Sequence, residues 1–362
     1  MKTRTLVTER RSGGFTLLEM IVAMSLGLLV LAGATRLFSD ASQASYIVAQ
    51  RGEMQQNARA VINSMVRDLS LAGTGLPLGG IALPSGNGSS ASKFACDQTG
   101  TCYTAPNNIF PTQRFYAAIP GPAFGPMVTG RSTDVVTLAY TDTSLPLNSC
   151  ALAAITPAGD QITVGACMTN PAPGTPGFND PAVGVKVGDL VMLQNANGAA
   201  VGTVTLIQPN GNISFANGDW LNINQSAAAA GSITKSLSNP GAPGTYPPQG
   251  TTAIRVLLIT YFIQISGGAP RMMRQVNAQS PVPVADNIEG LQVFYDIFND
   301  ANGTATSNLP NANNLPNQIR KIDIAVTART ATQQLAPGRD FQRTTLATSV
   351  SPPNLSFRDR YQ

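Results

Sequence analysis

The sequence has no histidine and very little charge. Lysine, arginine, aspartate and glutamate make up 12% of the 362 residues, against roughly 25% in soluble globular domains. Without histidine, the chain cannot build a Ser-His or Cys-His nucleophilic site or a histidine-ligated metal site. We therefore predict a protein that is not an enzyme, with no catalytic residues and no metal or other cofactor.

Glycine, proline, serine, threonine and asparagine take the place of the missing charged residues. The chain has 34 glycines and 26 prolines, a mixture typical of short strands joined by many turns. The formal net charge is +4, and the first fourteen residues carry +3 of it, because they hold four basic side chains and one acidic one. The nearly neutral remainder offers no clustered basic surface for phosphates, so no nucleic-acid partner is predicted.

Residues 15–35 form an apolar run in which Glu19 is the one charged side chain. As a helix, this run is long enough to cross a bilayer. The basic residues before it place 1–14 in the cytoplasm and the rest of the chain on the exported side. An ordinary secretory signal would have its small residues after the apolar run, but here Gly13 and Gly14 precede it. Cleavage at Gly14 would therefore leave the apolar helix attached to the mature protein.

Glu19 is unusual because a carboxylate inside an apolar span costs about 2.5 to 3.5 kcal/mol on insertion scales. Such a group is by default a functional candidate that needs a partner. If cleavage frees the α-amine of Phe15, that cation lies four residues away and can neutralise Glu19 of the same or a neighbouring subunit. The alternative is a charge near enough to the membrane surface to reach water.

The string Gly14-Phe15-Thr16-Leu17-Leu18-Glu19, after a basic leader and before an apolar span, resembles the signal of type IV prepilins and type II secretion pseudopilins. The resemblance implies that a membrane prepilin peptidase cuts after Gly14 and methylates Phe15, and that Glu19 aids docking into the filament. It also implies partners: other pilins and minor pilins through the N-terminal helix, an inner-membrane assembly platform, and membrane lipid.

Helical patterning continues beyond the apolar span. Apolar residues recur at steps of three and four, which predicts one stripe that packs on a sheet; they are Met54, Ala58, Val61, Ile62, Met65 and Leu69. Gly73, Gly75 and Pro77 are expected to end the helix. Residues 58–73 resemble the stem end of the PilW branch of minor pilins. A solvated Arg67/Asp68 pair before a glycine cap explains the same residues.

Eight later runs predict strands, and Asn195 to Gly198 predicts a hairpin turn between two of them. The runs are 134–140, 161–164, 189–194, 200–207, 254–265, 291–298, 319–327 and 341–349. Residues 76–112 are expected to form a long irregular loop. Turn-rich connections are expected at 168–182, 209–219, 236–252 and 299–316.

About half of the expected head, the part of the chain after residue 73, also resembles the PilW branch of minor pilins. The matching segments are 189–194, 261–274, 288–295 and 321–330. Asp323 departs from the pattern, because an arginine is more usual there. Residues 76–180 and 208–252 have no counterpart in the resemblance, and the specificity of the head stays open.

Cys96, Cys102, Cys150 and Cys167 all lie on the expected exported side. An even count there favours disulfides. Of the three possible pairings, the simplest joins Cys96 to Cys102 and Cys150 to Cys167. A four-cysteine zinc site is the alternative, although neither spacing is the short kind that zinc sites use.

Asp296, Asp300 and Asn302 before Gly303 suggest either a calcium loop or, more simply, a polar turn.

These observations predict an α+β fold of the type IV pilin kind, with a long N-terminal transmembrane and amphipathic helix packed on a mostly antiparallel β-sheet head. The expected parts are a leader at 1–14, a transmembrane and polymerisation helix at 15–35, its amphipathic continuation at 36–73, and an exported β-rich head at 74–362.

The predicted function is that of a minor pilin-like structural subunit in type IV pilus assembly. The chain would cross the inner membrane once, hold its head in the periplasm, and then enter a filament at the cell surface. One alternative is a minor pseudopilin of type II secretion, of the J kind, which genomic context would distinguish. Another is a membrane-anchored periplasmic enzyme or binding protein that never polymerises, which a failure of peptidase processing would favour.

Overall fold

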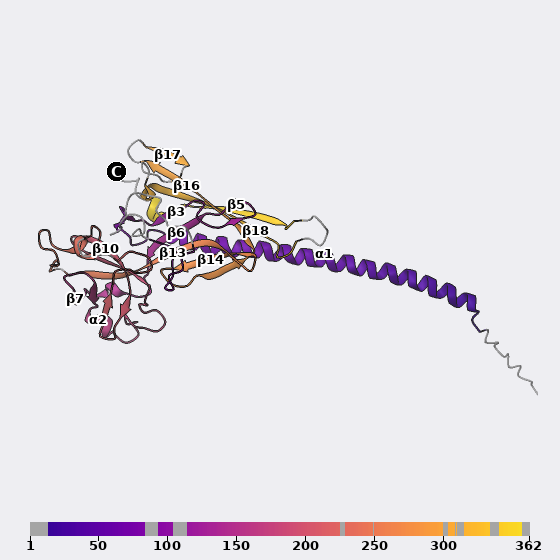
Figure 1. Cartoon of the computed structure of the whole chain (residues 1–362), viewed down its shortest axis with the longest axis horizontal. Coiled ribbons are helices and arrows are strands. Elements are labelled where there is room, and N and C mark those ends of the chain that lie inside the picture. The colour runs from indigo at the N-terminus through magenta and orange to yellow at the C-terminus, as the bar shows by residue number, and fades with distance from the viewer. Residues whose placement is uncertain are drawn as a thin grey trace, which may run out of the picture. The chain divides into compact units, whose positions relative to one another are not determined.

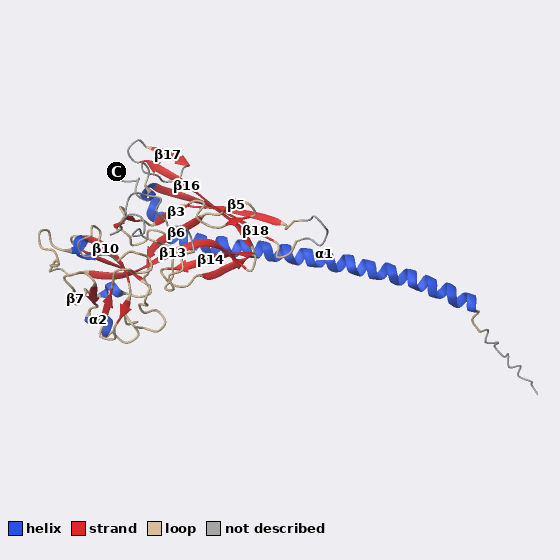
Figure 2. Cartoon of the chain, in the orientation of Figure 1, coloured by secondary structure: helices blue, strands red, loops and turns tan. Residues whose placement is uncertain are grey.

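The computed structural model describes residues 14–83, 93–103, 114–224, 229–248, 250–299, 303–307, 309, 315–333 and 340–356. Apart from Gly14, the leader expected at 1–14 lies outside the described residues. The chain divides into two compact units, residues 1–53 and 54–362. One helix, α1 (Leu17–Leu71, 55 residues), runs through both, and strands dominate the second unit (Figure 2).

Helix α1 ends where the glycines predict. Gly73 has a φ of +83°, a left-handed conformation that favours glycine after a helix. The Gly73 backbone N–H donates to the Ala139 carbonyl at 2.9 Å, so the chain leaves the helix already bonded to a strand.

The larger sheet has seven strands and is antiparallel at every pairing. Its longest strand is β13, where the sequence reads VLLITYFI and where β-branched and aromatic residues favour a buried strand. The order is β10 (Gly198–Thr203), β9 (Leu190–Asn195), β13 (Thr252–Ser266), β14 (Ala269–Val276) and β15 (Val282–Asp286), with β6 (Val135–Thr141) paired to β13 and β3 (Ala118–Gly121) paired to β6.

A second antiparallel sheet of four strands is formed by the last third of the chain, and Figure 1 labels three of its strands, β16, β17 and β18. The order is β17 (Thr304–Ser307), β16 (Ile288–Asn299), β18 (Ile319–Arg329) and β19 (Arg343–Val350). One face of this sheet is apolar and the other polar, because the side chains alternate along each strand.

The last turns of α1 and both sheets share one core. Met54, Ala58, Val61, Met65 and Leu69 are all buried in it, and Ile62 is partly buried against it. The other members include residues of β13 and β14 from the seven-stranded sheet and of β16 and β18 from the four-stranded sheet. The predicted apolar stripe and the predicted α+β architecture are therefore confirmed.

Apart from β9 and β10, the chain between β6 and β13 builds a small unit, whose hydrophobic cluster also takes in Val191, Leu193 and Ala200 of β9 and β10. It carries a third antiparallel sheet in the order β11 (Leu206–Ile207), β12 (Asn212–Ser214), β8 (Gln161–Thr163) and β7 (Ala154–Ile155). Short helices α2 (Ala166–Thr169) and α3 (Ile233–Leu237) complete it. The described residues also form β1 (Ile81–Ala82), β2 (Arg114–Phe115), β4 (Met127–Val128), β5 (Arg131–Ser132), α4 (Pro353–Ser356) and the 3₁₀ turns η2 (Leu147–Ser149) and η3 (Pro316–Gln318).

Each of the eight predicted runs contains a strand, and the Asn195–Gly198 hairpin is present, with Asn195 facing Gly198 in the register. The expected single strand at 200–207 was wrong: β10 and β11 are separate strands in different sheets. The hydrogen-bond partners change between them: the Val204 N–H donates to the carbonyl of Asp189, the residue before β9, whereas the Thr205 N–H donates to the carbonyl of Ser214 in β12.

Several strands lie where the sequence predicted connections or made no prediction. The segments expected as turns at 209–219 and 299–316 contain β12 and β17. The sequence did not predict strand β14 because its buried residues include proline and glutamine and are interrupted by Arg271 and Arg274, and its pairing with β13 compensates for that weak local pattern.

Candidate functional site

The N-terminal motif is built as a capped helix start. Thr16 is the residue before α1, and Glu19 is the third residue inside the helix. The Glu19 Oε2 accepts from the Thr16 backbone N–H and from the Thr16 hydroxyl, both at 3.0 Å, and the Glu19 N–H donates to Thr16 Oγ1 at 3.3 Å. This reciprocal pair is a capping box, in which threonine and glutamate satisfy two otherwise unpaired backbone donors.

Gly14 and Phe15 stand clear of the described chain. A Cβ placed on Gly14 would meet no described atom within 4 Å, and Phe15 is 87% exposed. The fold therefore places no steric demand of its own for glycine at position 14. Any such demand has to come from a molecule that recognises this segment.

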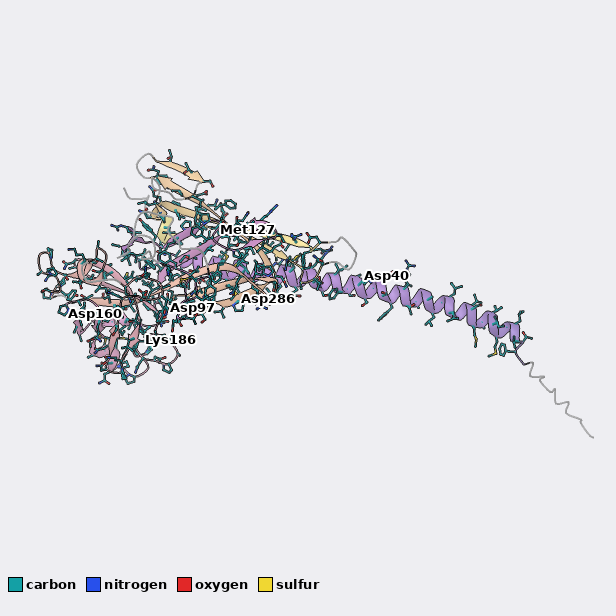
Figure 3. All side chains as sticks on the ribbon, in the orientation of Figure 1. Asp40, Asp97, Met127, Asp160, Lys186 and Asp286 are labelled. Carbon is teal, nitrogen blue, oxygen red and sulfur yellow. A yellow bond between two sulfur atoms is a disulfide. The ribbon has the colours of Figure 1, made fainter. Side chains whose placement is uncertain are left out.

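The apolar side chains in the N-terminal part of α1 are exposed, Leu17 at 80% and Leu29 at 72% among them, and Figure 3 shows this part of the helix running on its own beyond the strands. An 18-residue window has a mean hydropathy of 2.2 with no part of it buried in the chain. By length and composition this helix can cross a membrane. A continuous exposed apolar surface of this kind needs lipid or other protein to cover it.

The structure reveals a second site, at Asp68 near the end of α1, that sequence reasoning missed. Asp68 is 3% exposed. Its Oδ2 accepts from the Tyr261 hydroxyl at 2.6 Å and from Arg274 Nε at 2.8 Å, and its Oδ1 accepts from the Tyr140 hydroxyl at 3.0 Å. The alternative of a solvated Arg67/Asp68 pair is therefore wrong for Asp68.

A signal for this site was present in the sequence. Asp68 follows Met65 by three residues, so it lies on the apolar stripe of α1 and not on the solvent face. A charged residue on a buried stripe needs a partner of opposite charge. Arg274 is that partner, and it comes from β14, a strand that the sequence did not predict.

The Asp68 carboxylate changes the acidity of its donors. Burial, together with the Asp68 charge, raises the pKa of the Tyr140 hydroxyl to about 12, and the same causes raise the pKa of Tyr261. Burial alone would lower the pKa of Arg274, but the hydrogen bond and charge of Asp68 outweigh it and raise that pKa. All three donors thus stay protonated at neutral pH.

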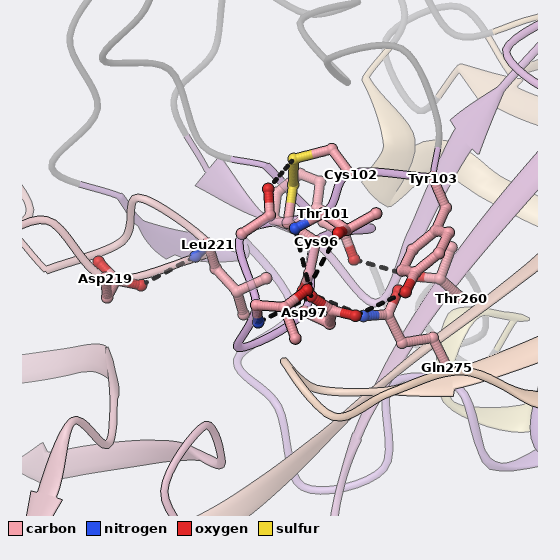
Figure 4. The surroundings of a disulfide bond; sticks show 12 residues. Cys96, Asp97, Thr101, Cys102, Tyr103, Asp219, Leu221, Thr260 and Gln275 are labelled. Atoms are coloured by element: carbon pink, nitrogen blue, oxygen red, sulfur yellow. Dashed lines mark hydrogen bonds between the residues drawn. A yellow bond between two sulfur atoms is a disulfide. The ribbon is translucent and has the colours of Figure 1, made fainter.

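The two disulfides join Cys96 to Cys102 and Cys150 to Cys167, so a zinc site made by these cysteines is excluded. Figure 4 shows Asp97 beneath the first disulfide. Its carboxylate accepts from the Thr99 N–H at 2.9 Å and from the Tyr103 hydroxyl at 2.5 Å. Burial acts to raise the pKa of Asp97, but these and further hydrogen bonds lower it overall.

Residues 93–103, around the first disulfide, form no named helix or strand, as expected of an irregular loop, but they are packed. Phe94 is buried and contacts Phe115 edge to face, and the Tyr103 ring stacks on Phe262 of β13 with centroids 5.3 Å apart. Elsewhere in the segment expected to be irregular, Ile81 and Ala82 form the short strand β1.

The second disulfide lies beside the cluster of the small unit, with Cys150 and Cys167 packed against it.

Arg255 of β13 forms ion pairs with two carboxylates, the first of which follows β6 directly. Its Nε donates to Asp142 Oδ2 at 2.8 Å, and its Nη1 lies 3.5 Å from Asp189 Oδ2. Burial raises the pKa of Asp189.

Only one of the three side chains of the possible calcium loop is among the described residues. Asp296 is part of β16 and forms an ion pair with Lys321 at 3.1 Å; Asp300 and Asn302 lie outside the described residues. Within the described ranges, no three histidine, cysteine, aspartate or glutamate side chains gather in a way that could hold a metal ion.

Comparison with known proteins locates a family signature in the first segment. The model of the prokaryotic N-terminal methylation motif matches residues 10–35. Among solved structures, this chain is similar to a type IV-like pilin from Thermus thermophilus, with 16% identity over 47% of this chain and 87% of that chain. The TM-score of 0.18 is too low for this similarity to support any argument about the fold. No match was found among curated proteins.

The chain thus carries a type IV prepilin-type signal at its N-terminus, followed by a helix able to span a membrane.

Proposed function

We propose that this chain is a membrane-anchored, pilin-like subunit that is processed by a prepilin peptidase and assembled into a type IV pilus. One observation carries the proposal: the methylation motif at 10–35 runs directly into an apolar helix that the chain leaves uncovered. Lipid covers such a surface before assembly, and the helices of neighbouring subunits cover it afterwards. The chain then needs no further site to act as a structural protein.

The peptidase would cut between Gly14 and Phe15 and methylate the new amine of Phe15. The cut would remove the leader and spare the helix cap, because Thr16 and Glu19 both lie on the mature side. The parts then follow the sequence: leader 1–14, membrane and polymerisation helix 15–35, its continuation 36–73, and a periplasmic head.

Mass spectrometry of the mature N-terminus tests processing directly. We expect a methylated Phe15 at the start in cells with the peptidase, and an uncut chain for Gly14→Val. Valine adds a side chain that the described chain itself has room for, so a processing defect would arise at the peptidase. A mature start at residue 1, or beyond residue 35, contradicts the proposal.

Glu19 has two separable roles, in capping α1 and in docking by its charge. Two substitutions distinguish them. Glu19→Gln keeps an oxygen that can accept from Thr16 and removes the charge, because glutamine also completes a capping box. Glu19→Ala removes both the cap and the charge. Each variant should still insert into the membrane, because insertion disfavours the charge.

If the charge guides docking, Glu19→Gln and Glu19→Ala lose filament incorporation equally. Incorporation is measured by immunoblot of sheared filaments, with the membrane fraction as the control for insertion. If the glutamine variant incorporates normally, the role of Glu19 is capping and the docking proposal is refuted.

Within this class we assign the chain to the minor pilins of the PilW kind, on the resemblance of its stem end and head segments. A type II secretion pseudopilin shares the same signal and would need the same N-terminal chemistry. Deleting the chain separates the two: loss of pili with normal secretion supports the pilus assignment, whereas loss of secretion with normal pili supports the pseudopilin.

A further inference from the structure

The polar face of the four-stranded sheet carries an open cavity of about 460 Å³. Its size lies within the range of about 300 to 1,000 Å³ that small-molecule sites occupy. One wall is the hairpin formed by β4 and β5, residues 128–133, and the floor is made by β16, β18 and β19. The N-terminal motif contributes nothing to it.

The cavity floor is a row of small polar residues in register. Gly290 faces Thr327, and Thr327 faces Thr345 on the next strand. The hydroxyls of Thr327 and Thr345 lie 2.9 Å apart. Gln292 also lines the floor. A Cβ on Gly290 would lie 3.1 Å from the Thr327 Cβ, so a larger residue there would crowd the floor.

Glu289 lies buried beside the cavity and holds Arg343, which also lines it. It is 6% exposed and sits where the register between β16 and β18 slips, between Ile288 and Gly290; such bulges often re-aim a side chain at a functional site. Its Oε1 accepts from Arg343 Nε. Its Oε2 is buried and has no hydrogen-bond partner among the described residues, which leaves a costly acceptor unsatisfied.

The charges around the cavity balance. Its lining holds two carboxylates, Glu289 and Asp340, and two guanidiniums, Arg131 and Arg343. Arg343 bridges the carboxylates, since its Nη1 also donates to Asp340 Oδ2 at 2.7 Å. A balanced lining gives no net attraction to a simple ion, while hydroxyl, amide and charged groups offer both donors and acceptors.

We propose that this cavity binds a neutral polyhydroxylated ligand, a saccharide, with its hydroxyls bonding to Thr327, Thr345 and Gln292. A hydroxyl can both donate and accept, so it matches the threonine hydroxyls and the glutamine amide together. The pilin-like subunit would then carry a sugar-binding face on its head, whatever its place in a filament.

The test uses the full-length protein in a detergent without a sugar head group. Saturation-transfer NMR is recorded with glucose, galactose and N-acetylglucosamine at millimolar concentration, and with lysine methyl ester and glucuronate as charged probes. We expect a neutral sugar to bind, and Thr327→Val or Gln292→Ala to weaken it about fivefold each, the loss of one hydrogen bond. Thr306→Val, an exposed threonine on β17 outside the cavity, should bind like the unaltered protein.

Three results overturn the proposal: no saccharide binds at millimolar concentration, the two floor variants bind as well as Thr306→Val, or a charged probe binds in preference to every neutral sugar. None of them bears on the filament role, because binding is measured on unassembled protein.

Discussion

The Asp68 cluster should be the most sensitive polar contact between α1 and the larger sheet. Asp68→Ala would leave the Arg274 guanidinium without its carboxylate and the hydroxyls of Tyr140 and Tyr261 without their acceptor. The change also removes a small buried volume. Because three donors lose one acceptor at once, we expect a larger loss of stability than for an ordinary surface ion pair.

The size of the loss follows from burial. The Asp68 side chain is 4% exposed and that of Arg274 is 27% exposed. Removing one partner of a fully buried ion pair costs about 3 to 5 kcal/mol. The remaining exposure of Arg274 lets water replace part of the interaction, so we expect about 3 kcal/mol less free energy of unfolding.

Strand β14 supplies a matched control. Arg271, three residues before Arg274, pairs with Asp286 of β15 at 2.7 Å, but these side chains are 42% and 55% exposed. An exposed pair of this kind contributes about 0 to 1 kcal/mol. Asp286→Ala should therefore change the free energy of unfolding by less than about 1 kcal/mol.

The assay is urea unfolding of the full-length protein in micelles, followed by the fluorescence of Trp220. This is the chain's one tryptophan, and it is half-buried against a hydrophobic cluster of the head. If Asp68→Ala unfolds at the same urea concentration as Asp286→Ala, the buried cluster does not stabilise the head and our reasoning is wrong.

Three further predictions concern the head. The pKa of Tyr140 is raised from its usual 10 to about 12, so the contribution of Tyr140 to stability is complete below pH 10 and lost as the pH rises to about 12. The free energy of unfolding of Tyr140→Phe should therefore fall less than that of the unaltered protein between pH 10 and 12. An equal fall in both proteins would show that Tyr140 does not contribute in this way. Residues 43–362, expressed in an oxidising compartment, should be a soluble monomer with two disulfides worth about 2 to 4 kcal/mol each; free thiols at all four cysteines would refute this. On the proposed filament role, a large head on stems that pack side by side favours low copy number near the tip, and quantitative proteomics of sheared filaments should find far less of this chain than of the principal pilin.

Local patterns were sufficient for the features that depend on neighbours in the sequence. The apolar run at 15–35, the stripe from Met54 to Leu69 and the Asn195–Gly198 hairpin each follow from a period or a turn within a few residues. Close spacing also favoured the Cys96–Cys102 pairing that the structure contains. The capping box of Thr16 and Glu19 is equally local and was readable as threonine followed by glutamate three residues later.

The sequence by itself determined the apolar helix able to span a membrane, its amphipathic continuation and the strand-rich head, because these depend on periodicity and composition. The apolar stripe of α1 carries Asp68 on its inward face, but only the tertiary structure decided its partners, since Tyr140, Tyr261 and Arg274 lie 72 to 206 residues away from it along the chain. The cavity around Glu289 likewise needs β5, β16 and β19 together. Contacts at such separations arise from strand pairing and register, and no local pattern of residue types specifies them.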